Sequence, residues 1–151
     1  MQRPNNMRRG TKAGLGGKPR PEDGNAVVEF VGVLAVIIIP ALVLLIGFAT
    51  TTRAQLALDD AARQGVRAYV RQASGQAAWQ QARAAAVTAW DDRGFSERLD
   101  VDASCTATPC LTPGEYVTIA VTARVEVPII GKLTLDASQT LVVDHYRAVR
   151  P

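Results

Sequence analysis

The chain has 151 residues, a formal net charge of +3 and an aromatic content of 5%. This length leaves room for one membrane segment and one small domain with a modest core. The small net charge and the scarcity of aromatic side chains give neither the basic surface nor the stacking platform of nucleic-acid-binding proteins, so no nucleic acid is expected among the partners.

Residues 1–23 combine positive charge with residues that disfavour regular structure. They contain six arginines and lysines together with several glycines and prolines, and they show no periodicity. We therefore expect a disordered segment. Its positive charge favours the cytoplasmic side of a membrane. Two interpretations stay open for this segment: a cytoplasmic leader, or the basic tail of an ordinary signal anchor.

A long apolar run follows. From Phe30 to Ala49 there are 20 residues without a charged side chain, and the uncharged stretch extends to Thr52. As a helix, such a run spans about 30 Å, the thickness of the hydrocarbon core of a bilayer. It is longer than the apolar part of a secretory signal peptide. We therefore predict a transmembrane helix over residues 25–52, with Glu29 at its border, where a carboxylate marks function or lies at the membrane interface.

Three residues inside this predicted helix bear on its packing. Pro40 would break a helix in water at a cost of about 3 kcal/mol, but in a membrane it is tolerated and predicts a kink. Gly32 and Gly47 remove bulk and permit close helix contacts, although their separation of 15 residues forms no GxxxG motif. A generic membrane helix is the alternative interpretation of both glycines.

The helical pattern continues beyond the apolar run. Apolar residues recur at spacings near 3.6, with charged residues between them, at Leu56, Ala62, Val66, Tyr69 and Ala73. This pattern predicts an amphipathic extension over residues 53–73. One helix is thus expected from about Ala26 to Gln72, half in lipid and half projecting, with a solvated charged face.

A second, shorter helix is predicted from about Gln76 to Asp91. Its apolar stripe consists of Trp79, Ala82, Ala86 and Trp90. The residues between them are good helix formers. We expect the two tryptophans to anchor this helix against a sheet rather than to form a ligand site.

From Leu99 onwards, apolar residues alternate with polar ones. Alternating runs begin at Leu99, Val117 and Leu133, and a turn from Pro128 to Lys132 separates the last two. A period of two indicates half-buried strands. Three neighbouring strands predict an antiparallel meander whose apolar face is covered by the second helix. The predicted fold class is α+β, with residues 74–151 forming one small domain.

The two cysteines, Cys105 and Cys110, lie in the loop after the first predicted strand. Four residues separate them, including Pro109, which stiffens the turn. Their Cα atoms can therefore approach within the roughly 4.4–6.8 Å that a disulfide requires. A single C-x4-C pair lacks the second ligand pair of a structural zinc site, so no metal is expected. A disulfide is favoured in an oxidising compartment, and two unpaired surface thiols are the alternative.

The border of the apolar run carries a recognisable motif. The order Gly24-Asn25-Ala26-Val27-Val28-Glu29-Phe30, followed by a hydrophobic helix, resembles the processing site of type IV prepilins and pseudopilins. With Pro40 and the segment from Leu56 to Arg67, the chain is similar to the TadE-like minor pseudopilins of tight-adherence (Tad) pili. The resemblance covers residues 24–67, and residues 142–147 are similar to the end of some members.

This resemblance implies a processing event and an assembly role. A prepilin peptidase would cleave after Gly24, which ends a basic cytoplasmic leader of residues 1–24, and Asn25 would become the new N-terminus. Glu29 then stands at position five of the mature chain, where it guides assembly together with Phe30. The alternative is that Glu29 only reaches out to the lipid headgroups. The predicted helix and sheet are pilin-like in outline.

No group of residues suggests catalysis. His145 is the single histidine, so no histidine pair can hold a metal, and we expect it at the surface. The glycines at 14, 16 and 17 lie in the basic segment with no strand before them, so they do not form a phosphate-binding loop. We expect no enzymatic activity, no cofactor and no small-molecule substrate.

The sequence is therefore interpreted as that of a minor pseudopilin of a Tad-type (type IVc) pilus or a related secretion fibre. Its expected partners are the membrane, a prepilin peptidase, other pilin and pseudopilin subunits, and the pilus assembly platform. The expected location is the cytoplasmic membrane, which the chain crosses once, with the N-terminus inside and residues 74–151 outside. Incorporation into an extracellular pilus is a further expected location. The alternative is an uncleaved single-pass membrane protein whose small extracytoplasmic domain binds a partner.

Overall fold

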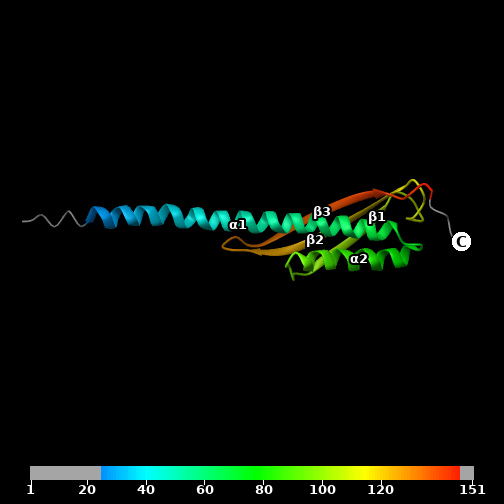
Figure 1. Ribbon diagram of the computed structural model, residues 1–151, viewed down its shortest axis with the longest axis horizontal. Coiled ribbons are helices and arrows are strands. Elements are labelled where there is room, and N and C mark those ends of the chain that lie inside the picture. Colours follow the sequence, from blue (N-terminus) through cyan, green and yellow to red (C-terminus); the bar gives the residue numbers. More distant parts are fainter. Residues whose placement is uncertain (1–24, 147–151) are drawn as a thin grey trace, which may run out of the picture. The chain divides into compact units, whose positions relative to one another are not determined.

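The structure, a computed structural model, describes residues 25–146. They form two helices and three strands in the order α1 (Asn25–Val70), α2 (Gly75–Asp92), β1 (Leu99–Cys105), β2 (Tyr116–Val127) and β3 (Gly131–Val142) (Figure 1). The predicted α+β fold and its order of elements are confirmed. The proposed leader of residues 1–24, including Gly24, and residues 147–151 lie outside the described residues.

Helix α1 agrees closely with the long helix expected from the sequence. It runs from Asn25, the first residue that the structure describes, to Val70, and its end lies within two residues of the predicted end. The helix continues through Pro40, so this proline does not end it. The kink expected there stays a prediction.

The sheet is an antiparallel meander with the strand order β1-β2-β3. Val121 of the central strand β2 lies opposite Val101 of β1 and Ala137 of β3. Alternate residues of β2 are buried, namely Val117, Ile119, Val121, Ala123, Val125 and Val127. Because successive side chains of a strand point to opposite faces, the period of two in the sequence produces one buried face, as predicted.

Residues of both helices join this face in one buried cluster. Helix α1 contributes Ala54, Ala57, Leu58, Ala61, Ala62, Val66 and Tyr69, and α2 contributes Ala78, Ala82, Ala86, Ala89 and Trp90. Gly65 marks a close approach: a Cβ atom built there would lie 3.3 Å from both the Ala82 carbonyl oxygen and Ile119 Cγ2. The absence of a side chain at this position lets α1, α2 and β2 meet.

The position of α1 corrects two expectations from the sequence. Only the second helix was expected to cover the sheet, whereas α1 also packs in this core. Leu56 was assigned to the buried stripe but is exposed, and Ala73 is exposed beyond the end of α1. The buried stripe consists mainly of alanines, which give a weak hydropathy signal but allow a helix to pack closely.

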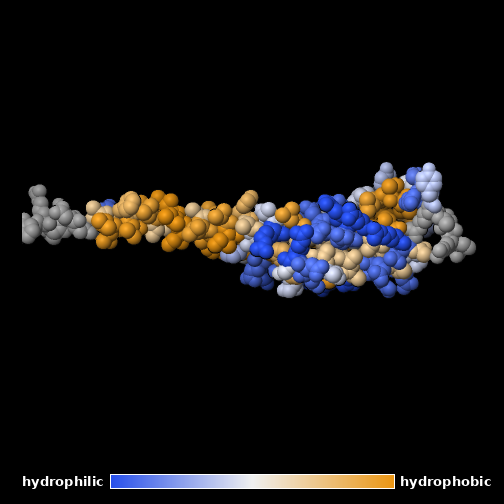
Figure 2. All heavy atoms as spheres, viewed as in Figure 1, coloured by the Kyte–Doolittle hydropathy of each residue, from blue (hydrophilic) through white to orange (hydrophobic). Residues whose placement is uncertain are grey.

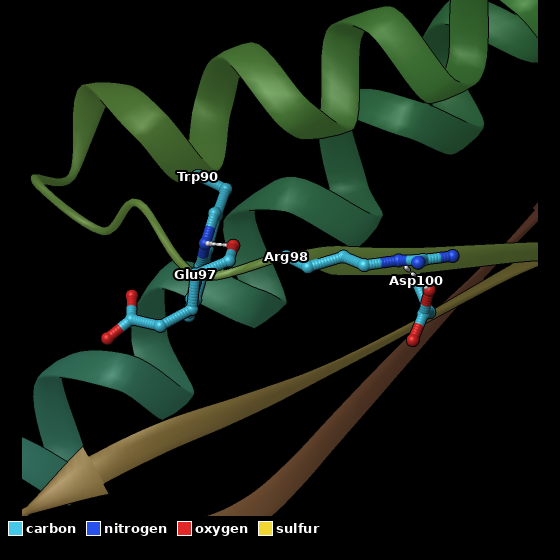
Figure 3. Close-up of polar contacts among 4 residues, drawn as sticks. All are labelled: Trp90, Glu97, Arg98 and Asp100. Atoms are coloured by element: carbon cyan, nitrogen blue, oxygen red, sulfur yellow. Dashed lines mark hydrogen bonds and ion pairs between the residues drawn. The ribbon is translucent and has the colours of Figure 1, made fainter.

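The two tryptophans of α2 differ in their surroundings. Trp90 is fully buried, stacks on Phe95 with 4.4 Å between ring centroids, and donates an Nε1–H hydrogen bond of 2.9 Å to the Glu97 carbonyl oxygen (Figure 3). Trp79 is half-buried and packs at the margin of the core. The predicted anchoring role is therefore filled mainly by Trp90.

The loop between β1 and β2 is cross-linked by a disulfide. Cys105 is bonded to Cys110, with their Cα atoms 5.2 Å apart, which confirms the predicted pairing. The Thr106 amide donates a hydrogen bond of 3.1 Å to the Tyr116 carbonyl oxygen. The disulfide and this hydrogen bond together hold the loop beside the first residue of β2.

Candidate membrane and assembly segment

The main functional candidate is the first part of α1, residues 26–52, which we call the apolar segment. Most of its side chains are exposed, including Phe30 at 64% and Phe48 at 73%. Figure 2 shows the resulting hydrophobic surface. Of the helices in residues 25–146, α1 alone is long and apolar enough to cross a membrane. Its length and composition fit a membrane span or a signal sequence.

Such a surface is not typical of a water-soluble monomer. Contiguous apolar patches on monomers rarely exceed a few hundred Å². A helix that is apolar on all sides is normally surrounded by protein or by lipid. The side chains of the apolar segment remain exposed within the described chain, so their cover must come from another molecule or from a membrane.

The hydroxyl groups at the end of the apolar segment form hydrogen bonds within the helix. The threonines at positions 50–52 each donate a hydrogen bond of 2.9 Å to the carbonyl oxygen four residues earlier. Polar groups paired within the helix are compatible with lipid, where unpaired ones are costly. The lipid-compatible stretch therefore extends to Thr52, directly before the exposed Arg53.

Glu29 lies in the second turn of α1, and its side chain is exposed. None of the ion pairs found between residues 25 and 146 includes it. The adjacent Phe30 is exposed as well. Both side chains are thus accessible to another molecule, and their role in assembly stays a prediction.

The remaining predicted site residues are distributed along the chain. Pro40 shares α1 with Glu29 and Phe30 but lies ten residues after Phe30, while the disulfide brings its own two residues together in a loop. Asn25 is the first residue of α1, and its side chain lies outside the described atoms. The cleavage predicted between Gly24 and Asn25 therefore stays a prediction.

The described part of the chain contains no cluster of side chains that could hold a metal ion and no buried polar side chain. His145 is exposed, as predicted, and its ring lies against Gly114, where an added Cβ would lie 2.5 Å from His145 Cε1. The expected lack of enzymatic activity and of a cofactor stays a prediction.

A hollow between α1 and α2 is lined mostly by polar and small side chains. It includes Asp60, Gln64, Gln81, Asp92 and Arg93. Arg93 forms an ion pair of 3.0 Å with Asp60, and both side chains remain partly exposed. This charge pair joins the two helices at the surface.

The sequence analysis missed a second group of exposed apolar residues. They lie in the hairpin tip, which we define as residues 127–131: the last residue of β2, the turn, and the first residue of β3. Ile129 is 82% exposed and Ile130 is 65% exposed. A signal was present in the sequence, because turns favour Gly, Asn, Asp, Pro and Ser, whereas here Pro128 is followed by two isoleucines.

No family model, characterised protein or solved structure matches the chain. Its architecture is pilin-like: a long N-terminal apolar helix is followed by a small antiparallel sheet. The features available for a functional proposal are this architecture, the exposed apolar segment and the order of residues at its border.

Proposed function

We propose that the chain is a minor pseudopilin, a non-enzymatic structural subunit of a Tad-type pilus or a related secretion fibre. The observation that carries the proposal is the exposed apolar segment at the start of a helix whose later residues belong to the core of an α+β unit. Lipid surrounds this segment before assembly, and helices of neighbouring subunits surround it in the fibre. Either environment contributes about 25 cal/mol for each Å² of apolar surface removed from water.

Processing by a prepilin peptidase between Gly24 and Asn25 removes the basic leader. One feature of the sequence supports this step: the chain changes there from a basic to an apolar sequence. The positive charge of residues 1–23 favours a cytoplasmic N-terminus. The Cys105–Cys110 disulfide suits an oxidising compartment outside the cytoplasmic membrane. The chain then crosses this membrane once, with its C-terminal part outside.

Glu29 sets the register of assembly in this proposal. Cleavage frees an α-amino group, which is mostly cationic at neutral pH because its reference pKa is near 8. An unpaired carboxylate in a low-dielectric environment is costly, and pairing with an ammonium group offsets much of that cost. The Asn25 amine of an incoming subunit meets Glu29 of a subunit already in the assembly. Phe30, exposed beside Glu29, adds an apolar contact.

Two substitutions test the proposal in cells that assemble the fibre. Gly24→Leu is expected to block processing and leave the full-length chain in the membrane. Glu29→Val is expected to leave insertion intact and to abolish incorporation into the fibre. Asp102→Val is a matched control, because it removes an exposed carboxylate from β1.

Immunoblots of membrane and fibre fractions give the result. Normal processing of Gly24→Leu would contradict cleavage at this position. A processed Glu29→Val chain that enters fibres as efficiently as the Asp102→Val chain would remove the register role, leaving Glu29 as a residue of the membrane border.

A further inference from the structure

The hairpin tip lies beside the apolar segment of α1. A Cβ atom built on Gly47 would lie 3.5 Å from Val127 Cγ1 and 3.7 Å from Ile130 Cδ1. Gly47 is buried, while its neighbours Ile46 and Phe48 are exposed. The loop between β2 and β3 (Figure 1) therefore reaches a part of α1 that has no charged side chain.

Three contacts show that the hairpin runs alongside α1 with its tip toward the apolar segment. The tip is next to Gly47, the Gln55 side-chain amide donates a hydrogen bond of 2.9 Å to the Asp136 carbonyl oxygen, and Gly65 faces Ile119. Positions farther along α1 thus meet residues farther from the tip. This order fixes the level of the tip along the helix.

The three turn residues of the tip expose their side chains, whereas Val127 is buried. Ile129 is 82% exposed and Ile130 is 65% exposed, and Pro128 between β2 and Ile129 is exposed as well. An exposed apolar cluster beside an exposed apolar helix forms one continuous surface. Whatever surrounds α1 at the level of Gly47 therefore also meets the tip.

Ile129 is in an unusual backbone conformation, with a φ angle of 70°. Positive φ is disfavoured for residues with a Cβ and most of all for branched ones, so turns of this kind normally use Gly, Asn or Asp. Exposure of the Ile129 side chain leaves it little to gain from contacts within its own chain. Strain of this kind is typical of functional positions, and it suggests that Ile129 gains its contacts outside the chain.

The level of the tip matches the outer border of a bilayer. Gly47 lies five residues before Thr52, the end of the uncharged stretch, which is about 7.5 Å along a helix. Segments that lie in the membrane interface bury their apolar side chains about 5–10 Å into the boundary between headgroups and acyl chains. The turn backbone prevents deeper insertion, because its unpaired polar groups are costly in hydrocarbon.

On both elements, charged residues lie within six residues of the contact between the tip and α1. Arg53 follows the apolar segment on α1, and Glu126 lies opposite Lys132 across the hairpin, one pair before Val127 and Gly131. All three are on the side of the tip that leads away from the apolar segment. Charged side chains near the membrane surface, and cationic ones in particular, can interact with the lipid headgroups.

We infer that the hairpin tip inserts into the outer border of the bilayer that surrounds the apolar segment, with Ile129 and Ile130 in contact with lipid acyl chains. This inference rests on the proposed function, since it requires the apolar segment to lie in a membrane. The tip is a second membrane contact beside the transmembrane helix. Two contacts limit tilting of the α+β unit on the membrane surface and hold it in one orientation before assembly.

Site-specific fluorescence in the full-length chain tests the inference. Ile129→Cys is labelled with an environment-sensitive fluorophore, with the native disulfide intact, and the protein is reconstituted in lipid nanodiscs. Thr134→Cys, exposed on β3, is the control for an aqueous position, and Leu42→Cys in the apolar segment is the control for lipid. Cysteine lacks the β-branch of isoleucine, so it adds no strain at position 129.

Nitroxides on lipid acyl chains are expected to quench the labels at 129 and 42 strongly, and aqueous iodide is expected to quench the label at 134. Because the interface shields the tip, iodide should quench the label at 129 at least about twofold less than the label at 134. A label at 129 that behaves like the label at 134, with the label at 42 in lipid, overturns the inference and leaves the proposed function intact. Iodide quenching at both 129 and 42 contradicts the membrane span itself. Shielding at 129 from both quenchers overturns the inference in favour of a protein neighbour.

Discussion

Two segments of the same helix meet different environments. The apolar segment, residues 26–52, is exposed on nearly all sides, whereas residues 54–69, which we call the core-facing segment, bury one face against the sheet and α2. The core-facing segment is the less hydrophobic of the two, and yet it is the buried one. The distribution of apolar residues around the helix, rather than their amount, decides which segment packs within the chain.

The size of the side chains explains how the core-facing segment packs. Its buried face consists mainly of alanines, with Gly65 at the junction of α1, α2 and β2. Small side chains allow close contact at the density of protein interiors. The apolar segment carries large aliphatic residues on every side, and these need a surrounding apolar medium.

Charges placed in the two segments should have the most unequal effects. Replacement of Ile38 and Leu42 by lysine is expected to cost about 6 kcal/mol of insertion free energy, since each lysine near the centre of a span costs about 2.5–3.5 kcal/mol. The matched pair Leu56→Lys and Gln64→Lys changes exposed positions of the core-facing segment and should leave insertion unchanged. Alkaline extraction of membranes measures the inserted fraction. Equal extraction of both double variants would contradict the membrane location of the apolar segment.

A substitution that creates a cavity should destabilise the protein in the core-facing segment and not in the apolar segment. Leu58 is fully buried and Leu44 is 69% exposed. Leu58→Ala is expected to lower the free energy of unfolding of the α+β unit by about 2–5 kcal/mol, while Leu44→Ala should change it by less than about 0.5 kcal/mol. Urea denaturation followed by tryptophan fluorescence measures both. Similar losses in the two variants would mean that the two segments do not differ in packing.

A substitution in the hairpin tip should change the free energy of unfolding by a smaller amount, and in this case raise it. Ile129→Asn relieves the positive φ, because asparagine tolerates this conformation, and should raise the free energy of unfolding by about 1 kcal/mol. Ile129→Val keeps the β-branch and should give no gain. Thermal unfolding distinguishes the two. A gain of equal size in both variants would show that the backbone conformation is not the source of the cost.

Glycine substitutions give the finest comparison of the two segments. Gly65→Ala adds a methyl group 3.3 Å from two neighbours, so crowding should outweigh the gain in helix propensity and lower the free energy of unfolding by about 0.5 kcal/mol. Gly32→Ala meets nothing within 4 Å and should leave the stability of the α+β unit unchanged. Both values come from the same urea titrations. A stabilised Gly65→Ala variant would indicate a looser junction of α1, α2 and β2.

Much of the fold follows from periodicity. The alternation along Val117–Val127 predicts a half-buried strand, and the structure has it as β2. The long apolar run predicts both the start of α1 and its exposure. The buried face of the core-facing segment was harder to predict, because alanine has little hydropathy contrast and the larger Leu56 pointed to the wrong side.

The candidate site was only partly predictable. The exposure of Glu29 and Phe30 follows from their place in an all-apolar helix. The contact between Gly47 and the hairpin tip joins residues 80 positions apart, and it depends on the direction in which β2 and β3 run along α1. Local patterns do not carry such information. The sequence left two interpretations of Gly47 open, a packing role between helices and a generic membrane helix, and neither pointed to the turn beside which Gly47 lies.

The central claim is that the chain is a processed pilin-like subunit, and N-terminal sequencing of the wild-type protein extracted from membranes tests it most directly. The account predicts that the mature chain begins at Asn25, with Glu29 as its fifth residue. A membrane-extracted chain that begins at Met1 or Gln2 would contradict it. That result would leave an uncleaved single-pass membrane protein with a partner-binding outer domain.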